Sequence, residues 1–181
     1  MNGRRRLPFA LLLLAALLFA CSGGPHLPRL VASDVVLAFG DSLTYGVGAH
    51  RNQAYPAVLQ TLLGRPVINA GVPGETTAEG LKRLPQTLDK HQPKILLLCL
   101  GGNDLLRGRP RTEITQNLRT MVALSRERNV AVVLVGVPEP RLFGGTAEFY
   151  EQIAEEFGLP YESGIMNEVL RSCLESRRLR V

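Results

Sequence analysis

The sequence contains no tryptophan, and aromatic residues make up only 6% of its 181 residues, so any core must consist mostly of aliphatic side chains. Cysteine is also scarce: Cys21, Cys99 and Cys173 lie far apart and form no Cys-x-x-Cys pair, and a disulfide between Cys99 and Cys173 is the one alternative if Cys21 is acylated. Cys99 lies inside an apolar run, where a small buried hydrophobe is the simplest interpretation. The three histidines are scattered, so the sequence predicts no metal site and no cofactor.

A basic face is missing as well, although the formal net charge is +5. Of 21 lysine and arginine residues, three lie at 4–6 and four at 171–180, which leaves 14 between 21 and 170 against 15 acidic residues. The body of the protein is therefore nearly neutral, which excludes a nucleic-acid partner. With 45% hydrophobic residues and 12 prolines, the chain is neither disordered nor a coiled coil, and its length suits one domain.

Residues 1–21 have the features of an export signal. Arg4–Arg6 precede an apolar run at 7–20, which is too short to span a bilayer as a stable helix. Ala20 before Cys21 resembles a bacterial lipoprotein box, in which Cys21 would become the lipid anchor. We therefore expect export to a bacterial periplasm and attachment to a membrane through Cys21. Ordinary cleavage near Ala20 and an uncleaved N-terminal anchor are the alternatives.

Apolar runs alternate with helical patterns after a linker at 22–33. Short apolar runs predict buried strands at 35–39, 67–69, 95–100 and 130–135, with a fifth starting near 159. Helices are predicted at 54–63 (with Val58, Leu59, Leu62 and Leu63 on one stripe), 77–88 (kinked or divided at Pro85), 112–128 (capped near Thr112) and 146–157 (stopped by Gly158). This order predicts an α/β fold, a three-layer α/β/α sandwich with a parallel sheet, over residues 34–170.

In such a fold the site forms at the carboxyl ends of the strands, so the residues directly after each strand carry the information. Ser42 comes after the first strand, in Gly40-Asp41-Ser42-Leu43-Thr44, where its hydroxyl is predicted to be exposed at a helix entrance. The alternative for Ser42 is a helix cap, the commonest use of serine at such a position.

The second and third strand ends offer neutral hydrogen-bond donors. Gly71 comes after the second strand, where its N–H can stabilise an oxyanion; the alternatives are a glycine turn or a phosphate loop, although the Lys-Ser/Thr ending of such a loop is missing. Asn103 comes after the third, as either a satisfied turn residue or a placed donor. A nucleophile beside several neutral donors is the arrangement that acyl transfer requires.

At this point the chain resembles a known family. The segments 36–44, 69–77 and 100–104, together with Arg83-Leu84-Pro85 and Leu105-Leu106-Arg107-Gly108, are similar to the SGNH (GDSL) hydrolases over about residues 33–170. The nearest group acts as arylesterase, acyl-CoA thioesterase and lysophospholipase. The resemblance implies a metal-free, flavodoxin-like sandwich with a five-stranded parallel sheet and a small acyl ester, thioester or lysophospholipid as substrate.

The resemblance also implies roles for individual residues. Ser42 would be the nucleophile, and the oxyanion hole would combine the N–H groups of Ser42 and Gly71 with the Asn103 side chain. Three further residues of the motifs, Asp41, Gly101 and Asp104, would support the site.

The family's late Asp-x-x-His block, which supplies the base and its orienting acid, has no counterpart here. The last aspartate is Asp104 and the last histidine is His91. His50 and His91 are interpreted as solvated surface residues. We expect a hydrolase domain truncated at its C-terminus, with 171–181 as an atypical basic tail and a frameshift or premature stop as the leading explanation.

Two functions therefore stand side by side. The first is a serine esterase lineage whose chain is truncated before the Asp-x-x-His block and is expected to be nearly inactive without it. The second is a non-catalytic acyl- or glycan-binding module that keeps the oxyanion pocket. A flavodoxin-like nucleotide or flavin binder is a distant third, since neither a phosphate loop nor a tryptophan to stack on a flavin is present.

Overall fold

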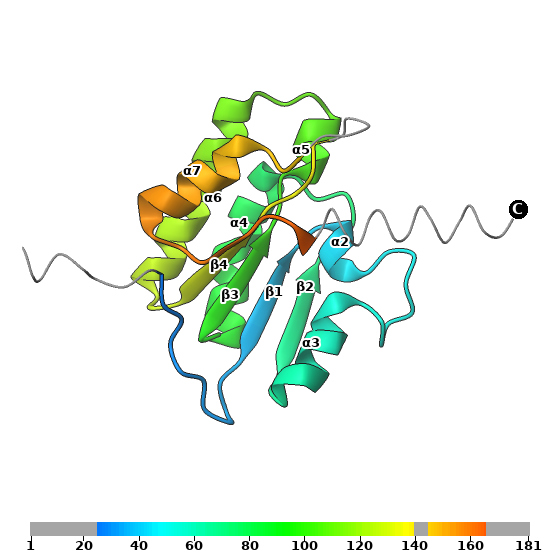
Figure 1. Ribbon diagram of the computed structural model, residues 1–181, viewed down its shortest axis with the longest axis vertical. Coiled ribbons are helices and arrows are strands. Elements are labelled where there is room, and N and C mark those ends of the chain that lie inside the picture. Colours follow the sequence, from blue (N-terminus) through cyan, green and yellow to red (C-terminus); the bar gives the residue numbers. More distant parts are fainter. Residues whose placement is uncertain (1–24, 140–144, 166–181) are drawn as a thin grey trace, which may run out of the picture.

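The computed structural model describes residues 25–139 and 145–165 as five strands and six helices around one parallel sheet (Figure 1). The strands are β1 (Val36–Gly40), β2 (Val67–Gly71), β3 (Ile95–Cys99), β4 (Ala131–Val135) and β5 (Tyr161–Glu162). The sheet order is β2-β1-β3-β4-β5 and every pair is parallel, which confirms the predicted flavodoxin-like α/β fold. The predicted export signal at 1–21, the predicted lipid anchor Cys21 and the predicted basic tail at 171–181 lie outside the described residues.

The helices are α2 (Ser42–Tyr45), α3 (Tyr55–Leu63), α4 (Thr77–His91), α5 (Gly102–Leu106), α6 (Arg111–Glu127) and α7 (Glu148–Phe157). Local signals account for several boundaries. Thr76 and Glu79 form a reciprocal capping box at the start of α4, and Gly158 ends α7 in the left-handed conformation. Helix α4 continues through Pro85 without dividing. The prediction of a cap at or near Thr112 is wrong for Thr112 itself: the N-cap is Pro110, which has no side-chain capping bond, and α6 begins at Arg111, one residue before the predicted start.

Two hydrophobic clusters cover the two faces of the sheet. Helices α4, α6 and α7 pack on one face around a large core in which Leu37, Phe39, Leu96 and Leu98 are fully buried. The second cluster contains Val36, Ala38, Val67 and Ile95, on the face that carries α3 (Figure 1). Strand β1 is buried along its whole length, whereas Leu97 and Val133 on the second face are half-buried. The second face is therefore the less completely covered of the two.

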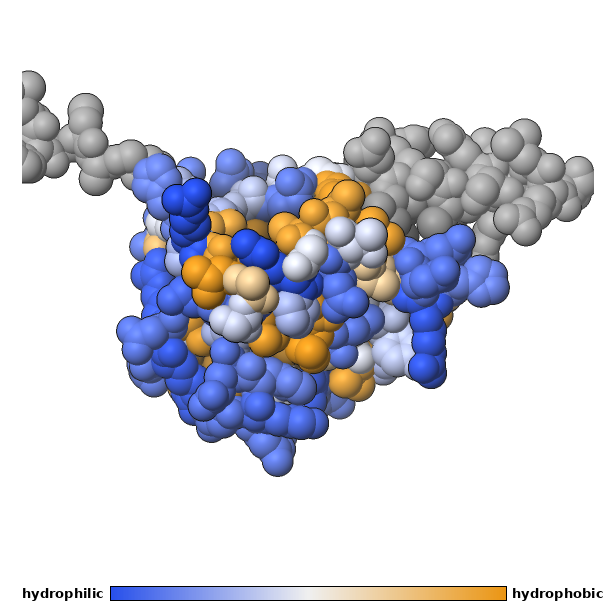
Figure 2. Space-filling model, turned by 90° about the horizontal axis from the view of Figure 1, so that it is seen from below, coloured by the Kyte–Doolittle hydropathy of each residue, from blue (hydrophilic) through white to orange (hydrophobic). Residues whose placement is uncertain are grey.

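The apolar stripe predicted on 54–63 is only partly buried. Leu59 packs against the second cluster, but Val58, Leu62 and Leu63 are exposed. The helix contacts the core through its first turn, where Tyr55 joins the cluster and Pro56 is buried. Figure 2 shows hydrophobic residues reaching the surface among hydrophilic ones. No helix within 25–139 or 145–165 combines the length and apolar character needed to cross a membrane.

Candidate active site

The carboxyl ends of three strands lie side by side in register. Gly40 of β1 pairs with Gly71 of β2 on one side and with Cys99 of β3 on the other. The segments after these three positions therefore leave the sheet at the same edge. This edge is where an open α/β fold places its binding site.

Ser42 is the first residue of α2, directly after Asp41. The cap of this short helix is Asp41, whose carboxylate accepts a hydrogen bond from the Leu43 N–H at 3.0 Å. The alternative that Ser42 itself caps the helix is therefore wrong. Ser42 is half-buried, and within residues 25–139 and 145–165 nothing hydrogen-bonds to its hydroxyl. Its oxygen is available to an incoming group.

Gly71 brings β2 and α2 into close contact. A Cβ atom at Gly71 would lie 2.2 Å from the Tyr45 nitrogen and 2.7 Å from the Thr44 carbonyl carbon. Only glycine permits this approach, because both obstacles are backbone atoms. The Gly71 N–H donates to the side-chain oxygen of Asn69 at 2.9 Å. A ligand oxygen that uses this N–H must share it with Asn69 or displace it.

Asn103 lies in α5, and its amide nitrogen donates in two directions. It bonds the Glu75 carbonyl oxygen at 3.0 Å and the Asp41 carboxylate at 3.2 Å. Two acceptors on the same side fix which end of the amide is nitrogen and turn that end toward Asp41. The longer bond, to Asp41, is the one that a ligand oxygen would replace more easily.

A pocket of about 260 Å³ joins Ser42 and Asn103. It is lined by Asp41, Ser42, Leu43, Gly102, Asn103, Leu106, Val137, Pro138 and Glu139. The structure thus brings Ser42, Asn103 and Asp41 together, whereas Gly71 lies beside the pocket, next to Gly40, and does not line it. The lining is largely aliphatic, which suits a short acyl chain or an aromatic ring.

The two remaining motif residues, Asp104 and Gly101, hold the site from beneath. Asp104 is buried and accepts hydrogen bonds from the Thr77 N–H at 2.8 Å and the Thr77 hydroxyl at 2.7 Å, which ties α5 to the start of α4. Gly101 precedes α5 with a φ of 119°, a conformation that favours glycine.

Sequence reasoning assigned no role to Glu75 and Arg83. Glu75 is buried and forms a two-point ion pair with Arg83, with both nitrogen–oxygen distances at 2.7 Å. Both residues stand in the segments that carry the family resemblance, but their spacing of eight residues spans a loop and two helical turns. No local pattern reveals such a contact.

Burial raises the pKa of the Asp41 carboxyl above its ordinary value of 3.8. The hydrogen bond from the Leu43 N–H lowers this pKa in part, and the nearby Glu75 and Asp104 carboxylates raise it further. The folded state therefore holds this proton to a higher pH than the unfolded state does.

We expect this proton to give the protein a specific pH dependence. As pH rises from about 3.8 through the folded-state pKa of Asp41, the free energy of unfolding should fall in wild type relative to Asp41→Asn, which keeps a capping oxygen but cannot ionise. Urea unfolding of both proteins from pH 4 to pH 7 measures the difference. A constant difference across that range would contradict the assignment.

The thiol beneath the site is inert. Burial raises the pKa of Cys99 to about 12, so the thiolate needed for reaction is absent near neutral pH. Cys99 is fully buried in the larger core cluster, which confirms its interpretation as a small hydrophobe. Among the described residues, no group of three or more histidine, cysteine, aspartate or glutamate side chains is placed to hold a metal ion.

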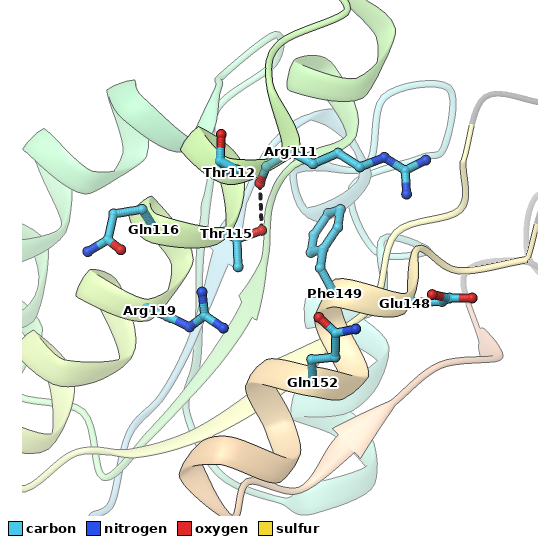
Figure 3. Close-up of a pocket in the computed structure, with 8 residues that line it drawn as sticks. All are labelled: Arg111, Thr112, Thr115, Gln116, Arg119, Glu148, Phe149 and Gln152. Carbon is cyan, nitrogen blue, oxygen red and sulfur yellow. Dashed lines mark hydrogen bonds between the residues drawn. The ribbon is translucent and has the colours of Figure 1, made fainter.

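A second pocket, of about 460 Å³, lies between α6 and α7 on the helical face. Figure 3 shows its lining residues on the two helices, with the Phe149 ring directed from α7 toward Arg111. Both of its arginines are engaged: Arg111 pairs with Glu139 and Arg119 with Glu156, each at 2.6 Å. None of the residues at the strand ends lines it, so it is separate from the Ser42 pocket.

The model of the GDSL-like lipase/acylhydrolase family matches residues 38–163, which include Ser42, Gly71 and Asn103. The chain belongs to this family. An arylesterase of Vibrio mimicus is 38% identical over 137 residues, 73% of this chain and 66% of that protein. The thioesterase 1/protease 1/lysophospholipase L1 of Escherichia coli strain K12 is 34% identical over 148 residues, covering 78% of this chain and 71% of that protein.

Solved GDSL-type structures agree with the fold. The crystal structure of AlinE4, an SGNH-hydrolase family esterase, aligns with a TM-score of 0.66 at 37% identity, over 74% of this chain and 77% of that one. The chain spans about two thirds of the length of the curated GDSL relatives that it matches.

Proposed function

We propose that the fold serves serine-dependent acyl transfer, with Ser42 as nucleophile. The observation that carries the proposal is that the Ser42 hydroxyl, which has no hydrogen-bond partner among the described residues, lines one pocket with the Asn103 amide. The oxygen of Ser42 would attack an acyl carbon, and the resulting oxyanion would accept hydrogen bonds from the Ser42 N–H, the Gly71 N–H and the Asn103 amide. The Gly71 and Asn103 donors come from separate segments, so their geometry depends on the packing at the sheet edge.

The substrate class that we propose is a small acyl ester or thioester, or a lysophospholipid. The support is the aliphatic wall of the Ser42 pocket, its modest volume of about 260 Å³, and the arylesterase, thioesterase and lysophospholipase names of the relatives.

Among the residues that the structure describes, neither His50 nor His91 is placed to activate Ser42. His91 is the last residue of α4 and comes four residues before β3, so it lies near the amino end of that strand. A five-residue strand is about 16 Å long at about 3.3 Å per residue, so His91 is about that far from the carboxyl edge of the sheet. His50 is exposed, in the loop between α2 and α3. We therefore propose that a chain of these residues alone hydrolyses esters feebly, through its oxyanion donors, at roughly 10³–10⁴ over water.

Added imidazole provides the test, because it can accept the Ser42 proton from solution. Nucleophile and base act as a unit, so without imidazole wild type and Ser42→Ala should turn over p-nitrophenyl acetate equally slowly. With imidazole, wild type should exceed Ser42→Ala by about tenfold, below the roughly 10²–10⁴ of a positioned base.

The imidazole-catalysed hydrolysis without protein is subtracted from both rates. Equal turnover of the two proteins at every imidazole concentration would overturn Ser42 as nucleophile and favour a non-catalytic acyl-binding module.

A further inference from the structure

Arg83 joins two of the segments that supply the proposed oxyanion donors. Its guanidinium lies in α4, outside the Ser42 pocket, and contacts three groups. It binds both carboxylate oxygens of Glu75 at 2.7 Å, and it donates to the Ala70 carbonyl oxygen at 3.0 Å. Its flat face stacks on the Phe39 ring, 4.0 Å from the ring centroid. This set of contacts holds the guanidinium in one plane.

The bond to Ala70 fixes the direction of the Gly71 N–H. The Ala70 carbonyl and the Gly71 N–H belong to the same planar trans peptide, so they point in opposite directions. By donating a hydrogen bond to the Ala70 carbonyl oxygen, Arg83 restrains the rotation of this peptide about its flanking bonds. The Gly71 N–H is thereby held pointing away from Arg83, where Asn69 now accepts it.

The ion pair between Arg83 and Glu75 helps to position the second donor, the Asn103 amide. The Glu75 side chain is only 5% exposed, so its charge depends on Arg83 for compensation. The backbone carbonyl of the same residue accepts the Asn103 amide at 3.0 Å. Fixing the Glu75 side chain therefore fixes the acceptor that orients Asn103.

The surroundings leave this arrangement little freedom. A Cβ atom at Gly80, one turn before Arg83 on α4, would lie 2.5 Å from a Leu100 methyl carbon and 3.5 Å from a Glu75 carboxylate oxygen. Glycine at this position lets α4 approach β3 closely enough for Arg83 to reach both Glu75 and Ala70.

We propose that Arg83, through Glu75 and the Ala70–Gly71 peptide, is the positioning residue of the oxyanion hole. The inference rests on the proposed function, because it concerns donors that act only if an acyl group reacts at this edge. Arg83 touches no reacting atom. It sets the angle of the Gly71 and Asn103 donors at once, so its loss should lower kcat and leave KM nearly unchanged.

The test compares three variants with a matched control. Arg83→Met keeps the aliphatic stem but removes every hydrogen bond, and Glu75→Gln/Arg83→Met also removes the buried charge while retaining the Glu75 backbone carbonyl. Arg83→Lys keeps the charge without the two-point geometry. The control is Arg128→Met: Arg128 is 29% exposed against 28% for Arg83 and pairs with Asp89 at 2.8 Å, at the opposite end of α6 from the site.

Two readouts are made on the full chain at a temperature where circular dichroism shows each variant folded. The first is kcat and KM for p-nitrophenyl acetate. The second is the ¹H–¹⁵N spectrum, with the Gly71 backbone signal and the Asn103 side-chain signals as reporters. We expect Arg83→Met and Glu75→Gln/Arg83→Met each to lose about tenfold in kcat and to shift the Gly71 and Asn103 signals. Arg83→Lys should recover part of the loss in kcat. The control Arg128→Met should match wild type in kcat and in both signals.

The outcomes separate the two proposals. If Asn103→Ala lowers turnover but the Arg83 variants do not, Arg83 has no positioning role and the proposed function stands. If Asn103→Ala leaves turnover unchanged, the proposed function loses its oxyanion donor, and the spectra alone decide the positioning role. Unchanged Gly71 and Asn103 signals in Arg83→Met and in Glu75→Gln/Arg83→Met would overturn the positioning role of Arg83 in either case.

Discussion

Replacing Gly101 by alanine should lower the free energy of unfolding by about 3 kcal/mol, from backbone strain together with a buried clash. The backbone at Gly101 has a φ of 119°, which costs an L-residue roughly 1–3 kcal/mol. A Cβ atom there would also lie 2.4 Å from the Tyr150 hydroxyl oxygen. Tyr150 is fully buried and donates to the Leu100 carbonyl at 2.7 Å, so displacing it breaks a buried bond worth about 1–3 kcal/mol.

Gly108→Ala is the matched control for this substitution. Gly108 also has a positive φ, of 64°, but a Cβ atom there would meet nothing within 4 Å. It should therefore lose only about 1 kcal/mol, from backbone strain alone. Urea unfolding followed by far-ultraviolet circular dichroism measures both. Equal losses in the two variants would show that the Tyr150 contact does not constrain Gly101.

Asn103→Ala should lower the turnover of p-nitrophenyl acetate by roughly 10²–10³, the usual cost of one oxyanion donor. In a chain of these 181 residues alone, we expect the oxyanion donors to supply most of the rate, so the loss should appear with and without imidazole. The Asn103 nitrogen is the only donor of the three that comes from a side chain, which makes it removable without changing the backbone.

A loss of folding stability is the main alternative explanation for a lower turnover of Asn103→Ala. The substitution leaves the Glu75 carbonyl and one Asp41 carboxylate oxygen without the bonds that Asn103 gives them. Thermal unfolding must therefore show that the variant is folded at the assay temperature. A folded Asn103→Ala with wild-type turnover would remove Asn103 from the proposed oxyanion hole.

The strands and the edge that they share were predictable from the sequence. Short apolar runs that stop at Gly40, Asn69 and Leu100 indicate buried strands, and a parallel sheet brings the residues after each strand to one edge. Ser42 and Asn103 do line one pocket there. The strand order β2-β1-β3-β4-β5 was not predicted from the strand pattern, because periodicity carries no information on which strands are neighbours.

Helix α3 shows what periodicity leaves undetermined. A stripe of apolar residues shows that they share a face, but the direction of that face depends on packing elsewhere. Leu59 meets the sheet, and Leu62, one turn later, is 77% exposed. The contacts of Arg83 and Asp104 could not be predicted from the sequence either. Asp104 bonds Thr77 across 27 positions, and such a pairing exists only once α4 and α5 are packed.

The covalent intermediate on Ser42 tests the central claim most directly. When Ser42 attacks p-nitrophenyl acetate, imidazole takes the hydroxyl proton, the oxygen–carbon bond forms and p-nitrophenolate leaves. Hydrolysis of the acetyl-serine needs a base again, so rapid removal of imidazole should trap the acetyl group. Peptide mapping by mass spectrometry should then find one acetyl group on the fragment containing Ser42, and none on that fragment in Ser42→Ala. An unmodified Ser42 fragment in wild type, or equal acetylation of that fragment in both proteins, would contradict the account.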